Sequence, residues 1–333
     1  MGFIDALPKA ELHVHLEGTL EPEEVFRLAA RNSVPLRWPS AAAMRADYDF
    51  TGLQHFLQLY WAGGTVLCRR EDFYDLTAAY LRRAAGQGVR RAEMFFSPET
   101  FLDRGIPVAD QLGGVLDAID DARADSGIDG ALLVIAQRHR DETSALEMLD
   151  AVDPHRDAIL GVGLGSAEVG NPPSKFARFF AAARDRGYRL TCHAGEEGPG
   201  DYVRDALDLG VERIDHGYAA AAHPDLVARL ADERVPVTLC PLSNLRLRVV
   251  DDLAGYPVRE FTDAGVLATV NSDDPPFFGG YVNENYAALA DAVGLGSAEI
   301  AALARTSFLA SFAGPAEVDR GVAAVDRYEQ GSS

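Results

Sequence analysis

The chain of 333 residues has few cysteines, no long apolar run and a shortage of basic residues. Its three cysteines, Cys68, Cys192 and Cys240, are widely spaced and form no C-x-x-C pair, which argues against a disulfide framework and a zinc ribbon. No apolar run is long enough to cross a bilayer, and an early acid stands where a signal peptide would carry its apolar stretch. We therefore expect a cytoplasmic protein.

The chain carries 31 basic against 51 acidic residues, a formal net charge of -20. Such a surface repels phosphate backbones and anionic lipid, so neither nucleic acid nor a membrane is expected as a partner. The acids are dispersed, which favours a role in solubility over an acidic tail. Hydrophobic residues make up 47% of the chain, enough for the core of one large domain or two small ones. The composition carries no signal for an oligomeric state.

Apolar runs of strand length alternate with helical patterns along almost the whole chain. Several runs, such as residues 131–136, are continuously apolar, as in parallel strands that are buried on both faces. Gly187, Gly210 and Gly265 close helical patterns before the next apolar run. The alternation predicts an α/β fold, a (β/α)8 TIM barrel. Its eight strands are expected at residues 11–15, 89–96, 131–136, 159–164, 189–193, 213–216, 236–240 and 265–271.

Residues 17–64 are too many for one β/α unit and contain helical stretches at 22–31 and 53–61. We predict a helical insertion after the first strand, within a single domain that spans residues 1–333. The loop after a barrel strand lies at the carboxyl-terminal face, where an insertion could roof an active site. A plain packing elaboration is the alternative. A final helix is expected after residue 316.

Histidines stand at the ends of several predicted strands. His13 and His15 are two residues apart, so both would point into the barrel. His193 ends the fifth strand before a glycine-rich loop that carries Glu196, and His216 ends the sixth strand. An H-x-H pattern alone is a weak signal, and an isolated histidine after an apolar run is more often a core residue. Four of them on one face of a barrel favour a shared site.

Two adjacent acids, Asp273 and Asp274, follow the last apolar run. Neighbouring carboxylates at the end of a buried strand are costly unless a positive charge compensates them, and a metal ion would do so. A polar turn before proline is the alternative. Glu197 is interpreted as an acid that complements a helix dipole, and Asp215 is expected to point away from His216. Three imidazoles and one carboxylate, with a histidine and acids beside them, suit metal-assisted hydrolysis.

Five ordered segments resemble the motifs of the adenosine/adenine deaminase family of the amidohydrolase superfamily. They are PKAELHVHLEG (8–18), HAGE (193–196), DHG (215–217), CPLSN (240–244) and NSDDP (271–275). The resemblance extends from Leu7 to about Phe312. It implies a (β/α)8 barrel that forms a single metal-dependent hydrolase domain with one catalytic Zn²⁺ per chain. Fe²⁺ or Mn²⁺ stay open, because a set of three histidines and one aspartate does not select sharply.

Carried over by position, the resemblance implies a role for each candidate residue. The metal ligands would be His13, His15, His193 and Asp273. Glu196 would donate a proton to N1 of a purine, and His216 would orient or deprotonate the attacking water. Asp274 would hydrogen-bond N7, while Gly165 and Ser166 would contact the N3 side and Glu17 would belong to the substrate-binding residues.

Within the family, several segments resemble the adenine branch, which acts on the free base. Glu17 follows His-Leu where the other branch has aspartate, and residues 168–176 and 273–285 also look like the adenine branch. Gly165 departs from the pattern, because the branch usually has an acid there. A glycine would leave more space and remove a charge near the substrate.

The resemblance therefore implies hydrolytic deamination of a 6-aminopurine by a zinc-activated water, with adenine converted to hypoxanthine and ammonia. Deamination of adenosine, or of a larger or modified adenine derivative, is the alternative that Gly165 motivates. A catalytically silent metal-binding protein is a third hypothesis, because a fold does not determine a function. It would require the loss of a key group, and none is missing. Purine salvage and a specialised biosynthetic pathway are both compatible with these residues.

Overall fold

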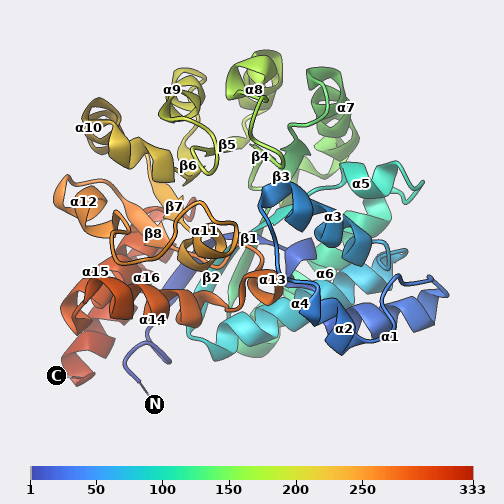
Figure 1. The fold of residues 1–333 in the computed structure, drawn as a ribbon, viewed down its shortest axis with the longest axis horizontal. Helices are drawn as coiled ribbons and strands as arrows, with labels where there is room; N and C mark the ends of the chain where they lie inside the picture. The colour runs from blue at the N-terminus through green and yellow to red at the C-terminus, as the bar shows by residue number, and fades with distance from the viewer. Residues whose placement is uncertain (1, 333) are drawn as a thin grey trace.

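Eight parallel strands form one sheet that curves into a barrel in the computed structural model, which describes residues 2–332 (Figure 1). Neighbouring strands pair in chain order, which confirms the predicted (β/α)8 TIM barrel. All eight predicted strands are present, with ends that differ by a few residues. Met1 and Ser333, the ends of the predicted domain, lie outside the described residues. The strands are β1 Lys9–His15, β2 Val89–Phe96, β3 Asp129–Gln137, β4 Gly161–Gly165, β5 Arg189–Ala194, β6 Arg213–His216, β7 Val237–Leu239 and β8 Ala268–Val270.

The residues that follow β8 join it to β1. The backbone N–H of Asp273 donates to the carbonyl of His13 at 3.0 Å, and the N–H of His15 donates to the carbonyl of Asp273 at 3.0 Å. Two residues earlier, the side-chain Oδ1 of Asn271 accepts the N–H of Leu12 at 2.8 Å. The barrel is therefore closed by a short backbone bridge and a side chain rather than by a long ladder.

Helices surround the barrel and connect its strands (Figure 1). The helices predicted between the strands are all found, and so is the final helix, α16. The helices α13, α14 and α15, which lie between β8 and α16, are not among the predicted helices. The helices are α1 Pro22–Asn32, α2 Ala41–Ala46, α3 Leu53–Gly64, α4 Arg70–Gly86, α5 Glu99–Leu102, α6 Val108–Ser126, α7 Glu142–Val152, α8 Ala177–Asp185, α9 Gly200–Asp208, α10 Pro224–Asp232, α11 Pro241–Arg246, α12 Val258–Asp263, α13 Pro275–Phe278, α14 Val282–Val293, α15 Ser297–Leu309 and α16 Pro315–Ser332, with short 3₁₀ turns η1 Glu17–Thr19, η2 Asp153–Ala158, η3 Pro173–Phe176 and η4 Tyr218–Ala222.

The segment 17–64 contains η1, α1, α2 and α3, so its predicted helical content is present. In Figure 1, α3, α11 and α13 lie in front of the strands. Aromatic rings join α3 to α13: the centroid of the Phe56 ring lies 4.8 Å from that of Phe278 and 5.3 Å from that of Phe277. Tyr48, which precedes α3, stacks on Phe277 at 4.4 Å. The inserted helices are therefore packed onto the barrel through its last β/α connection.

The barrel interior combines a small apolar cluster with a buried ionic network. The carboxylate of Glu93 accepts hydrogen bonds from Arg91 Nε at 2.7 Å, from Arg213 Nη1 at 2.5 Å and from the N–H of Phe312 at 2.8 Å. Glu93 and Arg213 are fully buried. Such a network is costly to desolvate and stays stable only while each charge keeps its partner.

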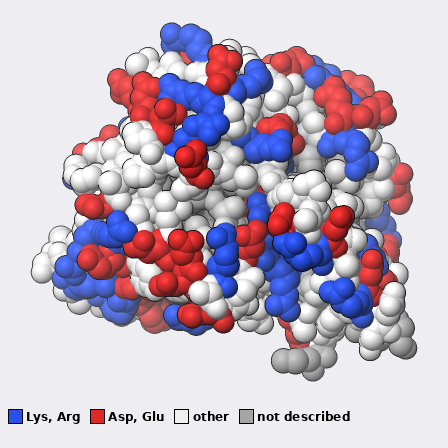
Figure 2. Space-filling view, turned by 180° about the vertical axis from the view of Figure 1, so that it is seen from behind, with Lys and Arg blue, Asp and Glu red and all other residues white. Residues whose placement is uncertain are grey.

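Charged residues of both signs are interspersed on the face of the molecule that Figure 2 shows, in agreement with the dispersed acids of the sequence. Among residues 2–332, no helix has the length and the apolar character needed to span a membrane.

We expect Glu93→Ala to lower the free energy of unfolding by roughly 3–5 kcal/mol. The substitution leaves Arg213 buried with Asp215, whose Oδ1 lies 3.6 Å from Arg213 Nε, as its remaining acidic neighbour. Urea denaturation followed by circular dichroism measures the change.

The matched control is Asp117→Ala, which breaks an ion pair of 2.6 Å with Arg70 in which both side chains are about half exposed. This control is expected to cost less than about 1 kcal/mol. A Glu93→Ala protein that loses no more stability than the control would contradict the role assigned to the buried network.

Candidate active site

The ends of β1 and β5 and the segment that follows β8 bring the predicted metal ligands close to one another. Nε2 of His15 lies 3.1 Å from Nε2 of His193, and Asp273 Oδ1 lies 3.5 Å from Nε2 of both His13 and His15. Four donor atoms placed tetrahedrally about 2.1 Å from one ion are about 3.4 Å apart. These three separations are those expected between neighbouring ligands of one divalent ion, and the donor atoms of the three imidazoles all lie within 4.8 Å of one another.

The protonation states of these side chains also fit a metal. Burial lowers the pKa of His13, and it lowers the pKa of His15 to about 3. Burial alone would raise the pKa of Asp273, but its contacts with His13 and the other imidazoles hold the pKa well below its ordinary value. Neutral imidazoles and an ionised carboxylate are the forms that bind metals. Nε2 of His13 is buried and has no hydrogen-bond partner among residues 2–332, as expected of an atom that awaits a ligand.

In two of the candidate ligands, His13 and His193, the ring nitrogen Nδ1 lies close to a side chain of a neighbouring strand. Nδ1 of His13 lies 2.8 Å from Thr238 Oγ1, and Nδ1 of His193 lies 3.3 Å from Asp215 Oδ2. Partners of this kind fix the orientation and the tautomer of a metal-binding imidazole. Asp215 is therefore a candidate support for His193, one of the predicted metal ligands, through this ion-pair contact.

The prediction that Asp215 points away from His216 is wrong, because both side chains lie inside the barrel. His216 has a φ of 65°, in the left-handed region, so the regular alternation of β6 ends at this residue. A non-glycine residue in this conformation is strained and is common at functional sites. The signal that identifies Asp215 in the sequence is the pair of charges at Arg213 and Asp215, two residues apart in an apolar strand.

Glu196 and His216 form a pair suited to proton transfer. His216 Nε2 lies 3.6 Å from Glu196 Oε2 and 4.0 Å from Asp273 Oδ2. Burial raises the pKa of Glu196 well above its ordinary value, and the charges of Asp273 and Glu168 raise it further. Burial lowers the pKa of His216 well below its ordinary value. The site thus holds a neutral carboxylic acid beside a neutral imidazole.

Asp274 is a second carboxyl group that burial keeps neutral. Burial and the neighbouring charge of Asp273 raise its pKa well above the ordinary value. Its Oδ1 is buried and finds no hydrogen-bond partner in the described part of the chain. A Cβ atom on Gly18 would lie 1.6 Å from this oxygen, which explains why a glycine follows Glu17.

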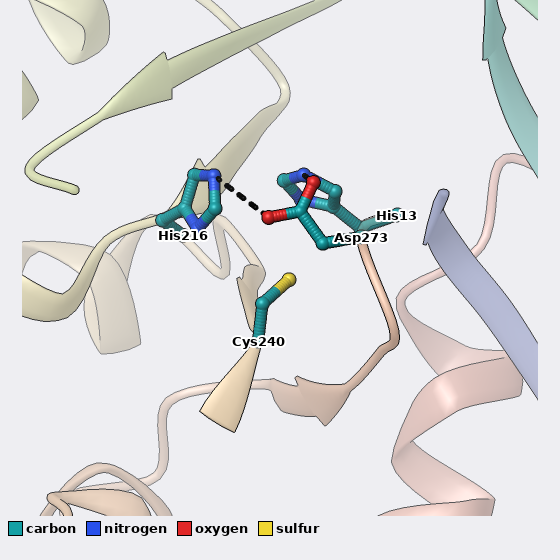
Figure 3. Close-up of side chains that lie close together, drawn as sticks. All are labelled: His13, His216, Cys240 and Asp273. Atoms are coloured by element: carbon teal, nitrogen blue, oxygen red, sulfur yellow. Dashed lines mark ion pairs between the residues drawn. The ribbon is translucent and has the colours of Figure 1, made fainter. Parts of the chain in front are cut away.

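Figure 3 shows His13, His216 and Asp273 directed at one another, with Cys240 close to them. Burial, reinforced by the charge of Asp273, raises the pKa of the Cys240 thiol well above its ordinary value. Cys240 belongs to a second group whose donor atoms lie within 4.8 Å of one another, together with His13, His216 and Asp273.

A cavity lies over these groups, with a polar floor and an apolar cover. Its cover includes Leu53, Phe56, Leu57, Tyr60 and Trp61, all from α3. Its polar lining consists of His15, Ser97, Gln137, Ser166, His193, Glu196, His216, Asp273 and Asp274.

Of the predicted substrate-binding residues, Asp274 and Ser166 line the cavity, whereas Gly165 and Glu17 do not. The Glu17 carboxylate accepts the N–H of Ser97 at 2.8 Å, so Glu17 supports a residue that lines the cavity. Burial raises the pKa of Glu17 to about 7. A Cβ atom at Gly165 would lie 2.8 Å from Ile135 Cγ2. Ile135 therefore already occupies the space that Gly165 was expected to leave open.

Comparisons with known proteins show which family the chain resembles over almost its whole length. The family described as Adenosine deaminase matches residues 8–327. The adenine deaminase of Rhodopseudomonas palustris (strain BisB18) is 52% identical over 93% of this chain and 91% of its own length. The crystal structure of an adenine deaminase from Arthrobacter aurescens is 45% identical, with a TM-score of 0.95 over 98% of this chain and 100% of its own. A crystal structure of an amidohydrolase from Burkholderia ambifaria with bound Zn is 29% identical, with a TM-score of 0.91 over 98% of this chain and 92% of its own.

We expect Asp215→Asn to weaken metal binding by about 10- to 100-fold, because the amide no longer offers His193 Nδ1 a charged acceptor. Competition between the protein and a chelator of known affinity measures the change without any assay of activity. Ile214→Val, on the same strand with a side chain in the core outside the site, is the control and should bind metal as the unmodified protein does. Equal affinities for all three proteins would refute the supporting role of Asp215.

Proposed function

The chain belongs to the adenosine deaminase family, and on that basis we propose that it deaminates adenine by hydrolysis to hypoxanthine and ammonia. The observation that carries the proposal is the group of three imidazoles, His13, His15 and His193, with the carboxylate of Asp273 beside two of them and a neutral acid and a neutral imidazole nearby. Relatives that are about half identical over more than nine-tenths of the chain bear the name adenine deaminase. The three cysteines are unpaired, which suits the reducing cytoplasm as the proposed location.

His13, His15, His193 and Asp273 would hold one divalent ion, for which we favour Zn²⁺, the ion bound by the related amidohydrolase. When bound, such an ion lowers the pKa of a water ligand from about 15.7 to about 7 and so makes a nucleophile available at neutral pH. The donor set also suits Fe²⁺ or Mn²⁺. Two observations support this ligand set: the donor atoms of the three imidazoles lie within 4.8 Å of one another, and Asp273 Oδ1 lies 3.5 Å from Nε2 of both His13 and His15.

Glu196 supplies the proton that makes the purine reactive. Because its carboxyl group is neutral, it can donate to N1 and thereby make C6 more electrophilic. His216, 3.6 Å away, is neutral and can accept a proton from the attacking water or orient it. The acid and the base are thus in the forms required before the reaction starts.

Asp274 orients the purine ring. A neutral carboxyl group can donate a hydrogen bond, and N7 of adenine is an acceptor, so the unpartnered oxygen of Asp274 is a suitable partner for N7. Ser166 lines the cavity and has a φ of 76°, so its backbone is turned out of the regular strand direction. We assign Ser166 to the N3 side of the base; Gly165 precedes it but does not line the cavity.

The inserted segment 17–64 acts as the roof of the site in this proposal. Leu53, Phe56 and Trp61 of α3 line the cavity opposite the polar floor. An apolar cover excludes water, which strengthens electrostatic interactions beneath it and keeps Glu196 neutral. Since Ile135 fills the space beside Gly165, the glycine does not enlarge the cavity for a nucleoside, and the free base is the favoured substrate.

We expect the purified protein to convert adenine to hypoxanthine with release of one ammonia per base. The value of kcat/KM for adenine should exceed those for adenosine and N6-methyladenine. Absorbance and ammonia assays over this panel, with metal analysis of the same preparation, test the proposal. Chelation should abolish turnover and added Zn²⁺ should restore it. A protein that processes adenosine far faster than adenine would contradict the assignment.

Glu196→Gln should lower kcat by roughly 10²–10⁴-fold, because an amide of the same size cannot donate the proton to N1. Steady-state kinetics with adenine measure the effect, and metal content should stay unchanged. Glu142→Gln is the control: this carboxylate accepts the N–H of Arg178 at 2.6 Å in the outer layer of helices, and its loss should leave turnover as it was. Full activity of the Glu196→Gln protein would eliminate Glu196 as the acid.

A further inference from the structure

One buried carboxylate outside the predicted site holds the loop that carries Glu196. The oxygens of Glu168 accept the backbone N–H groups of four consecutive residues. The donors are Gly195 at 2.7 Å, Glu196 at 3.0 Å, Glu197 at 2.9 Å and Gly198 at 2.7 Å. These residues lie between the end of β5 and the start of α9, so no helix or strand satisfies their N–H groups. The conformation of this loop, residues 195–198, therefore depends on one side chain from the β4–α8 connection.

A buried arginine fixes this carboxylate from the other side. Glu168 is 1% exposed and Arg138 is 0% exposed, and Arg138 Nη1 lies 3.9 Å from Glu168 Oε1. Arg138 Nη1 also donates to the carbonyl of His193 at 2.5 Å, and its Nε donates to the carbonyl of Asn171 at 2.8 Å. Arg138 directly follows β3. It thus connects this strand to His193, a metal-ligand candidate, and to the β4–α8 connection that carries Glu168. The charge of Arg138 offsets part of the cost of burying Glu168.

The same loop is attached to the roof. Glu197 Oε1 accepts the N–H of Leu53 at 3.3 Å, at the first residue of α3. The interpretation of Glu197 as an acid that complements a helix dipole is therefore compatible with the structure, although the helix is α3 and not the following α9. Glu168 therefore holds the backbone of the loop, and Glu197 connects the loop to α3, which covers the cavity.

We propose that Glu168 is a positioning residue for the reaction, which holds loop 195–198 so that the carboxyl group of Glu196 stays beside His216 and faces the cavity. The assignment rests on the proposed function, in which Glu196 donates a proton. Four hydrogen bonds to a charged acceptor give the loop one conformation before substrate enters. Loss of the support by Glu168 should affect the chemical step more than substrate binding. The reason is that Glu196 acts in the transition state, while Asp274 and the cavity walls bind the base.

The test is Glu168→Gln, which keeps the size of the side chain but turns its NH₂ group toward N–H donors. We expect kcat for adenine to fall by about 100-fold, because a displacement of a catalytic group by about 1 Å has an effect of this size. KM and metal content should change little.

The matched control is Asp72→Asn. Asp72 is also fully buried and accepts two backbone N–H groups, from Cys68 at 2.8 Å and from Arg69 at 3.0 Å, but it does not line the cavity. Its substitution should lower stability without a loss of kcat. A Glu168→Gln protein that keeps kcat, or a control that loses kcat as strongly, would overturn the proposal.

A second measurement needs neither activity nor a variant. Hydrogen exchange of the unmodified protein should show slow exchange at the amides of residues 195–198, despite their position in a loop. Exchange at the rate of an unprotected loop would also overturn the proposal, even if Glu168→Gln fails to fold. If the unmodified protein does not deaminate adenine while these amides are protected, the proposed substrate is wrong, but Glu168 still holds loop 195–198 as proposed.

Discussion

The site depends on the closure of the barrel between β1 and the residues after β8. The backbone of Asp273 is hydrogen-bonded on one side to His13 and on the other to His15, so three ligand candidates from opposite ends of the chain are fixed by two hydrogen bonds of 3.0 Å. The preceding residue, Ser272, donates its N–H to the buried carboxylate of Glu11 at 3.1 Å. Because the closure of the barrel and the candidate ligand set share residues, the candidate metal site can form only in the closed barrel.

Asp273, an ionised group at the junction between β1 and the residues after β8, influences the protonation of its neighbours. Asp273 stays ionised through its contacts with imidazoles, although it is buried. Its charge adds to the effect of burial and keeps Glu196 and Asp274 in their neutral, donating forms. An acid that must donate at neutral pH is therefore produced by its surroundings and not by its residue type. The neutral forms of Glu196 and Asp274 therefore follow from burial, with the negative charge of Asp273 as a second cause.

The fold and most of the candidate site could be predicted because the signals are periodic. Apolar runs that alternate with helices predict the barrel, and polar residues at strand ends predict that His13, His193 and Asp273 meet. The rest depends on conformations that have no periodic signature. Asp215 points inward with Arg213 by the regular alternation of β6, and His216 also does so because its backbone is left-handed. The role of Glu168 follows from a loop whose N–H groups converge only in three dimensions.

Loop 195–198 carries Glu196 and connects it both to Glu168, which supports the loop, and to α3, which covers the cavity. The N–H groups of this loop are bound by Glu168, and its Glu197 side chain binds the first residue of α3, which supplies the apolar cover. If α3 moved away, water would reach Glu196, and the loss of burial, the largest cause of its raised pKa, would favour the ionised form. An open site would thus contain a carboxylate that cannot donate, whereas a closed site contains the acid. The attachment of the roof to the catalytic loop therefore links the exclusion of water to the protonation state that the reaction requires.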